Sequence, residues 1–140
     1  MQLAIYAALF FTVVLLVTTA YFLMGGLPLL ILKHDTPTDA WFVHRFFTIY
    51  YKCVFYAATG AAISYALSGR FAFAVEVALI GLAAVALRRR LMPAMELIGA
   101  RIQEDGASAV ARFRTVHSVA LLINLAQLVF LVWSLTRLSL

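Results

Sequence analysis

The chain has 140 residues, of which 65% are hydrophobic and only 12% are charged, and its formal net charge is +5. Soluble proteins carry about 25% charged residues, and apolar surface in contact with water costs about 25 cal/mol per Å². The composition therefore excludes a water-soluble domain and predicts an integral membrane protein whose first partner is the lipid bilayer. The basic residues flank hydrophobic segments, as topology signals do, so the net charge does not indicate a nucleic-acid partner.

The first predicted element is a hydrophobic segment that covers residues 3–32. Met1 and Gln2 carry no positive side chain, and the segment is much longer than the ~7–15 apolar residues of a signal peptide. We therefore expect a retained transmembrane helix. Gly25, Gly26 and Pro28 are expected to interrupt it near its end, so that residues 27–32 form a kinked continuation or an interfacial turn.

Three further hydrophobic segments follow, at residues 41–67, 71–87 and 113–136. Each approaches or exceeds the length of ~20 residues that crosses the ~30 Å hydrocarbon core of a bilayer. Ser68-Gly69-Arg70 separates the second segment from the third and is typical of a tight turn. The sequence thus predicts an all-α protein, a single domain with a bundle of about four transmembrane helices.

Residues 91–112, between the third and fourth segments, combine apolar and charged side chains at helical spacing. The apolar positions are Leu91, Met95, Ile98 and Ile102, and the charged positions between them are Glu96, Arg101 and Glu104. This pattern predicts an amphipathic cytoplasmic helix, which either lies on the membrane or extends the third segment. Gly106 is the expected break before the fourth segment.

The orientation is predicted from the basic residues. Eight of them flank the two odd-numbered loops: Lys33, Arg45, Arg88, Arg89, Arg90, Arg101, Arg112 and Arg114. Only Arg70 and Arg137 lie on the other side. Because basic loops remain in the cytoplasm, we expect both termini outside it, in a multi-pass protein of the cell membrane, the inner membrane if the source is bacterial.

Small residues predict how the helices associate. They recur through the second segment (Ala57, Ala58, Gly60, Ala61, Ala62, Ser64) and the third (Ala74, Ala78, Gly81). Small side chains allow close backbone approach, which drives helix association in lipid. We expect a tight hairpin of these two segments, and association of the protein with itself or with a larger membrane complex.

Polar residues inside the segments need an explanation, because an ionisable group in the bilayer costs ~2.5–3.5 kcal/mol on insertion scales. Arg114, His117 and Asn124 share one face of the fourth segment, and Lys52 follows His44 on the second. Lys52 lies ~12 Å beyond His44, and Asn124 lies ~10 Å beyond His117. These five residues are therefore candidates for a polar pocket that opens toward the cytoplasm.

Simpler roles remain open for the same residues. Lys52 can extend its ammonium group to the interface, and the two histidines can be interfacial or hydrogen-bonded. Asn124 and Gln127 are of the type that joins helices by hydrogen bonds. Glu76 is an intramembrane acid on the opposite side from Lys52, where it reaches the outer interface, bonds across the bundle or carries protons or cations.

Cofactor sites are only weakly indicated. His44 and His117 on neighbouring helices are the minimum for a bis-histidine haem, but two histidines have no distinctive spacing. Cys53, the single cysteine, lies ~14 Å along the helix from His44, too far to join it in a zinc or copper site. We therefore expect no haem, and the sequence leaves a metal undetermined. No organised set of serine, histidine and acid is visible for nucleophilic catalysis.

The C-terminal half resembles a known family. The matching motifs are Arg90-Leu91-Met92-Pro93, the acidic stretch through Glu104, Phe113-Arg114-Thr115-Val116-His117-Ser118 and Leu122-Ile123-Asn124-Leu125. They are similar to the pattern of the transmembrane-protein-205-like proteins, an uncharacterised group of four-helix membrane proteins. The resemblance implies that Arg90, Pro93, His117 and Asn124 occupy the family's motif positions. The first segment departs from the pattern because it lacks an early histidine.

Together these patterns favour a non-enzymatic accessory subunit or a transporter-like module. Two alternatives stay open: a haem-binding or metal-binding redox subunit that uses His44 and His117, and a membrane enzyme that acts on a lipid-soluble substrate.

Overall fold

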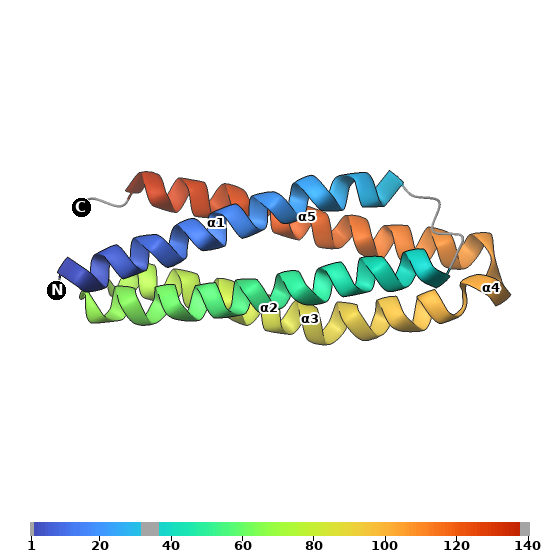
Figure 1. Ribbon diagram of the computed structural model, residues 1–140, viewed down its shortest axis with the longest axis horizontal. Helices are drawn as coiled ribbons and strands as arrows, with labels where there is room; N and C mark the ends of the chain where they lie inside the picture. The colour runs from blue at the N-terminus through green and yellow to red at the C-terminus, as the bar shows by residue number, and fades with distance from the viewer. Residues whose placement is uncertain (1, 32–36, 138–140) are drawn as a thin grey trace.

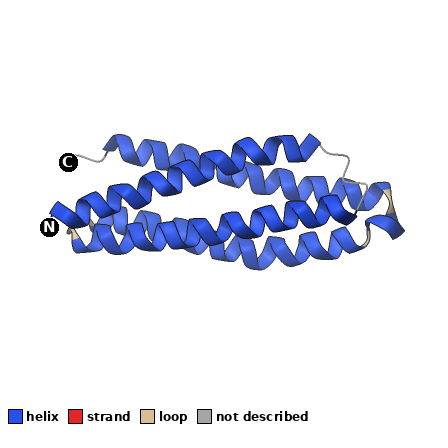
Figure 2. Ribbon diagram, in the orientation of Figure 1, coloured by secondary structure: helices blue, strands red, loops and turns tan. Residues whose placement is uncertain are grey.

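The computed structural model describes residues 2–31 and 37–137, and no strand occurs in these ranges (Figure 2). Its helices are α1 (Gln2–Ile31), α2 (Pro37–Leu67), α3 (Phe71–Ala100), α4 (Ile102–Asp105) and α5 (Ala107–Arg137). All but α4 are long and apolar enough to cross a membrane. The predicted all-α fold with four helices of spanning length is confirmed.

The four long helices form an elongated up-and-down bundle (Figure 1). α1 and α3 lie diagonally opposite each other, and each packs against both α2 and α5. The beginning of α1 and the end of α5 lie at one end of the bundle, together with the turn between α2 and α3. α4 lies at the other end, which we call the α4 end.

α1 continues as a helix through Gly25, Gly26 and Pro28 to Ile31, so an interfacial turn is not found in the described part of this segment. Gly25 and Gly26 serve close packing instead. A Cβ atom added to Gly25 would lie 2.9 Å from Cζ of Phe46, and one added to Gly26 would lie 2.6 Å from Cδ2 of Leu121. Pro28 lies near the end of α1, where its missing amide hydrogen removes one i→i−4 hydrogen bond without ending the helix.

α3 extends thirteen residues beyond the predicted end at residue 87, passes through Pro93 and ends at Ala100. Of the two arrangements predicted for residues 91–112, a helix of its own on the membrane is not found in this described part of the chain, and residues 91–100 extend α3 instead. The apolar face of residues 91–100 is packed inside the bundle. Met95 is 1% exposed, and a Cβ atom on Gly99 would lie 3.1 Å from Cβ of Ala40. The apolar spacing that suggested contact with lipid instead reflects packing between α3 and α2.

α2 and α3 form the predicted tight hairpin. Gly69 in the connecting turn has a φ angle of +77°, a conformation that glycine adopts without steric cost. The amide of Arg70 donates a hydrogen bond to the Tyr65 carbonyl (2.9 Å). Further along, a Cβ atom on Gly81 would lie 3.2 Å from Cβ of Ala58, so the two backbones approach closely where both residues are small.

Aromatic rings fill the centre of the bundle. The ring of Phe22 on α1 stacks on that of Tyr50 on α2 with a centroid separation of 3.8 Å. Phe22 also contacts Phe47 edge to face at 4.8 Å. Nearer the termini, the hydroxyls of Thr12 and Tyr65 lie 3.1 Å apart and join α1 to α2 again. The core is therefore closed by packed side chains along most of its length.

Candidate functional site

A group of buried polar side chains, which we call the core polar cluster, joins three helices at the centre of the bundle. It consists of Thr19 on α1, Tyr50 on α2, and Asn124 and Gln127 on α5. The Tyr50 hydroxyl donates to Oδ1 of Asn124 (2.7 Å), whose Nδ2 donates to the carbonyl of Ala120 (2.7 Å). Nε2 of Gln127 donates to Oγ1 of Thr19 (3.3 Å). These polar groups are thus largely satisfied by one another.

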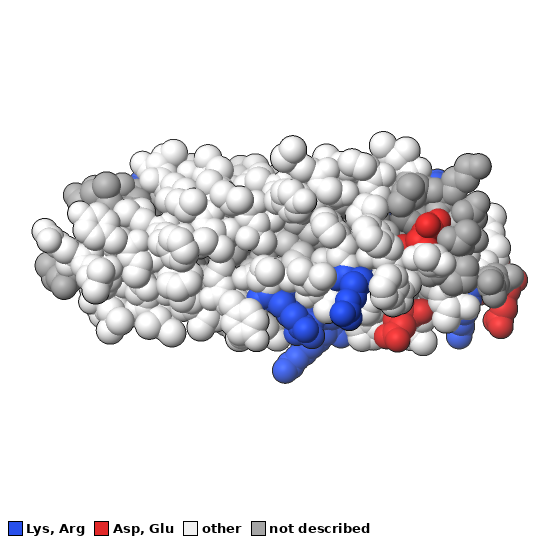
Figure 3. All heavy atoms as spheres, in the orientation of Figure 1, with Lys and Arg blue, Asp and Glu red and all other residues white. Residues whose placement is uncertain are grey.

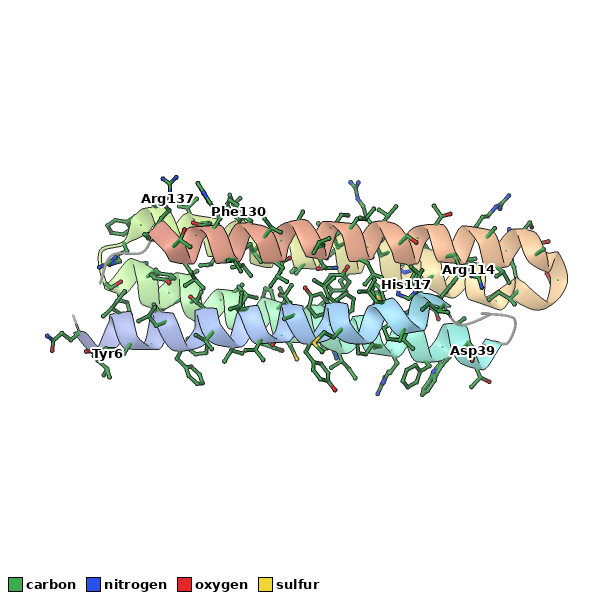
Figure 4. The ribbon with its side chains drawn as sticks, turned by 90° about the horizontal axis from the view of Figure 1, so that it is seen from above. Tyr6, Asp39, Arg114, His117, Phe130 and Arg137 are labelled. Carbon is green, nitrogen blue, oxygen red and sulfur yellow. The ribbon has the colours of Figure 1, made fainter. Side chains whose placement is uncertain are left out.

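His117 belongs to the same core but has aromatic surroundings. Its side chain is fully buried, and its ring meets that of Phe47 edge to face at 5.1 Å. Figure 4 shows His117 between the helices and Arg114 closer to the α4 end. Arg114 is exposed. The stripe predicted on α5 therefore runs from an exposed arginine into the core.

A second site is an open groove of about 890 Å³ between α2 and α3, which we call the α2–α3 groove. Its α2 side consists of His44, Thr48, Tyr51, Lys52, Phe55 and Tyr56, and its α3 side of Leu82, Val85, Arg88, Arg89, Met92, Pro93 and Glu96. The groove therefore combines basic, aromatic and aliphatic side chains.

The structure divides the predicted polar pocket between these two places. His117 and Asn124 are in the core, whereas His44 and Lys52 line the α2–α3 groove and Arg114 is exposed. The core-facing side of α2 is formed instead by aromatic and small residues: Val43, Phe47, Tyr50, Tyr51, Val54, Ala57, Ala58 and Ala61. An ammonium group beside this close-packed surface would lose its hydration, so an outward position for Lys52 is the less costly one.

Glu76 belongs to neither place. It is half-buried on α3, and its Oε1 atom is buried without a hydrogen-bond partner in the described part of the chain. It lines neither the α2–α3 groove nor the core polar cluster.

No cluster of three or more histidine, cysteine or acidic side chains suited to a metal occurs among the described residues. His44 faces the groove and His117 the core, so the two candidates for haem ligation do not open into one cavity. A porphyrin beside His117 would have to displace Phe47, which is fully buried. The residues present therefore do not fit a haem as they stand.

Four residues of these two places are not predicted from the sequence as site residues: Thr19 and Tyr50 in the core, and Arg88 and Arg89 in the groove. The spacing of Phe47, Tyr50, Val54 and Ala57 places Tyr50 on one helix face with them, which is the signal in the sequence for this part of the core. Arg88 and Arg89 were interpreted only as topology signals, and nothing in their spacing distinguishes the two from Arg90.

No family model, curated protein or solved structure matches this chain.

Proposed function

We propose that the protein is a non-enzymatic accessory subunit that spans the membrane four times and stabilises a larger membrane assembly. The observation that carries the proposal is the hydrogen bond between Tyr50 and Asn124, in which polar groups inside the bundle satisfy each other. A transport path needs polar groups that are free to meet a solute. In this core they serve to join α1, α2 and α5, which is a structural role.

The outer surface also supports the proposal. α1 carries no charged residue, and its side chains of Tyr21, Met24 and Ile31 are 72–82% exposed. A continuous apolar face of this kind suits contact with lipid or with the helices of another membrane protein. The family that the C-terminal half resembles consists of four-helix membrane proteins, which agrees with a small bundle of this kind.

In the proposed orientation the α4 end faces the cytoplasm and both termini lie outside it. Figure 3 shows the basic and acidic side chains gathered toward the α4 end on this face, whereas the half toward the termini is largely uncharged. Basic residues on that side include Arg45, Arg101, Arg112 and Arg114. We assign the protein to the cell membrane, the inner membrane in a bacterium.

Both alternatives are less well supported. A bis-histidine haem would require His44 and His117 to face one cavity, and they do not. An enzyme would require a reactive group in an ordered pocket, whereas Lys52, the strongest candidate, is exposed in an open groove.

Extraction in a mild detergent tests the proposal. We expect the tagged full-length chain to purify with a larger membrane protein in fixed stoichiometry, and the complex to show no Soret band from this subunit. A chain that remains without a partner after extraction and after cross-linking in the intact membrane would contradict an accessory role. A Soret band that disappears in His44→Ala would establish the haem alternative instead.

A further inference from the structure

Three basic residues line the α2–α3 groove. Lys52 comes from α2, and Arg88 and Arg89 come from α3. All three side chains are exposed. Among the residues that line the groove, Glu96 is the one acid, so the lining carries three positive charges and one carboxylate. The groove therefore favours an anionic occupant.

The cations lie at the depth of a membrane surface. α2 and α3 are joined by a turn at the termini end, so depths on both helices can be measured from that turn. Lys52 is ~22 Å along α2 from Leu67, and Arg88 is ~26 Å along α3 from Phe71, at 1.5 Å per residue. With the turn taken as one boundary of the ~30 Å hydrocarbon core, the cations fall toward the opposite boundary, where lipid phosphates are found.

The groove is also graded in polarity along the bundle axis. The lining residues on the deep side of the cations, toward the termini, are largely aromatic or aliphatic, and include Phe55, Leu82 and Val85. On the other side, toward the α4 end, Met92 and Pro93 are joined by the polar side chains of His44, Thr48 and Glu96. A lipid of the adjoining leaflet has the same order, because its acyl chains point into the membrane and its headgroup points out. A free anion would gain no binding energy from the apolar half of the groove.

We propose that the α2–α3 groove binds an anionic phospholipid, whose phosphate contacts Lys52, Arg88 and Arg89 while one acyl chain lies against Phe55, Leu82 and Val85. Basic pockets between transmembrane helices on the cytoplasmic side are suited to such headgroups. This site is separate from the core polar cluster and does not depend on an accessory role.

Arg89 and Arg90 offer a matched pair of variants for the test. They are neighbours in one run of three exposed arginines, but Arg89 lines the groove and Arg90 does not. Native mass spectrometry of the full-length protein in mild detergent measures the affinity for phosphatidylglycerol, with phosphatidylcholine of the same chain lengths as the neutral-headgroup control. Circular dichroism confirms that each variant is folded.

We expect phosphatidylglycerol to bind in preference to phosphatidylcholine. Arg89→Gln should weaken its binding about fivefold, equivalent to the ~1 kcal/mol that one basic side chain contributes near a membrane surface. The Arg88→Gln/Arg89→Gln variant should lose about 25-fold, whereas Arg90→Gln should change the affinity less than about twofold.

Three results would overturn the proposal. One is equal binding of the two lipids, and another is an equal loss in Arg89→Gln and Arg90→Gln, which would indicate attraction by net charge alone. The third is displacement of phosphatidylglycerol by an excess of inorganic phosphate, which would assign the site to a free anion. Retention of the lipid in that experiment supports a site built for the whole molecule.

Discussion

At the scale of single residues, Asn124 illustrates how a polar side chain is accommodated inside a membrane bundle. It is fully buried, accepts a hydrogen bond from Tyr50 and donates one to the carbonyl one turn earlier on its own helix. Each amide group thus has a partner, and the side chain links α5 to α2. The cost of burying the amide is thereby offset without any ligand.

A double-mutant cycle measures this link. Asn124→Leu removes the acceptor and Tyr50→Phe removes the donor, so we expect a coupling free energy of ~0.6 kcal/mol and at most ~1.7 kcal/mol, the range known for such bonds in a membrane protein. The measurement is the free energy of unfolding of both single variants and the double variant.

Thr59→Val provides the control, because its hydroxyl bonds to the carbonyl of Phe55 on the same helix (2.8 Å). A cycle between Asn124→Leu and Thr59→Val should show no coupling. Zero coupling between Asn124 and Tyr50 as well would mean that the hydrogen bond does not join the helices.

At the scale of helices, the contact between Gly81 and Ala58 sets how closely α2 and α3 approach. Gly81→Leu would place four extra carbon atoms where a Cβ alone is already 3.2 Å from a neighbouring Cβ. We expect a loss of about 1–3 kcal/mol in the free energy of unfolding, measured in detergent.

Ala83→Leu is the matched control for this variant, because Ala83 is exposed two residues along the same helix and its larger replacement would face lipid. It should leave stability unchanged. Equal losses in the two variants would show that close packing at Gly81 does not hold the hairpin together.

Hydropathy predicted the existence of the four long helices, because an apolar run of spanning length has few other stable conformations in a membrane. It could not predict where α3 ends. Arg88, Arg89 and Arg90 end the hydrophobic segment, but the backbone hydrogen bonds of a helix do not depend on hydropathy, and α3 continues to Ala100.

Which face of α2 is turned to the core was harder to predict. In a soluble bundle the apolar face is the buried one, but in lipid both the core and the outer surface are apolar. The positions of Lys52 and His44 on one face were therefore compatible with a pocket inside the bundle and with a groove outside it. Packing of Phe47, Tyr50 and Ala57 toward the neighbouring helices decides between them. The spacing of these residues shows that they share a face, but not that this face is turned to the core.

At the scale of the whole molecule, the charged side chains on the face shown in Figure 3 gather toward the α4 end, and this distribution predicts the topology. Cysteine labelling tests it in a Cys53→Ser background, because the native Cys53 is exposed. We expect a membrane-impermeant maleimide to modify Gln2→Cys in intact cells and Asp105→Cys only after permeabilisation, since basic segments stay in the cytoplasm. Modification at position 105 in intact cells would reverse the orientation.

The uninterrupted α1 has a consequence for the bilayer around the protein. α1 is free of charge over all 30 residues, an apolar length of ~45 Å, whereas residues 71–87 of α3, diagonally opposite, give only ~26 Å before the first arginine. No single membrane thickness matches both flanks, and each ångström of hydrophobic mismatch costs a fraction of a kcal/mol. The bundle must therefore tilt, or thicken the bilayer beside α1 and thin it beside α3. Lipid chain length then becomes a variable that sets the tilt of the bundle in the membrane.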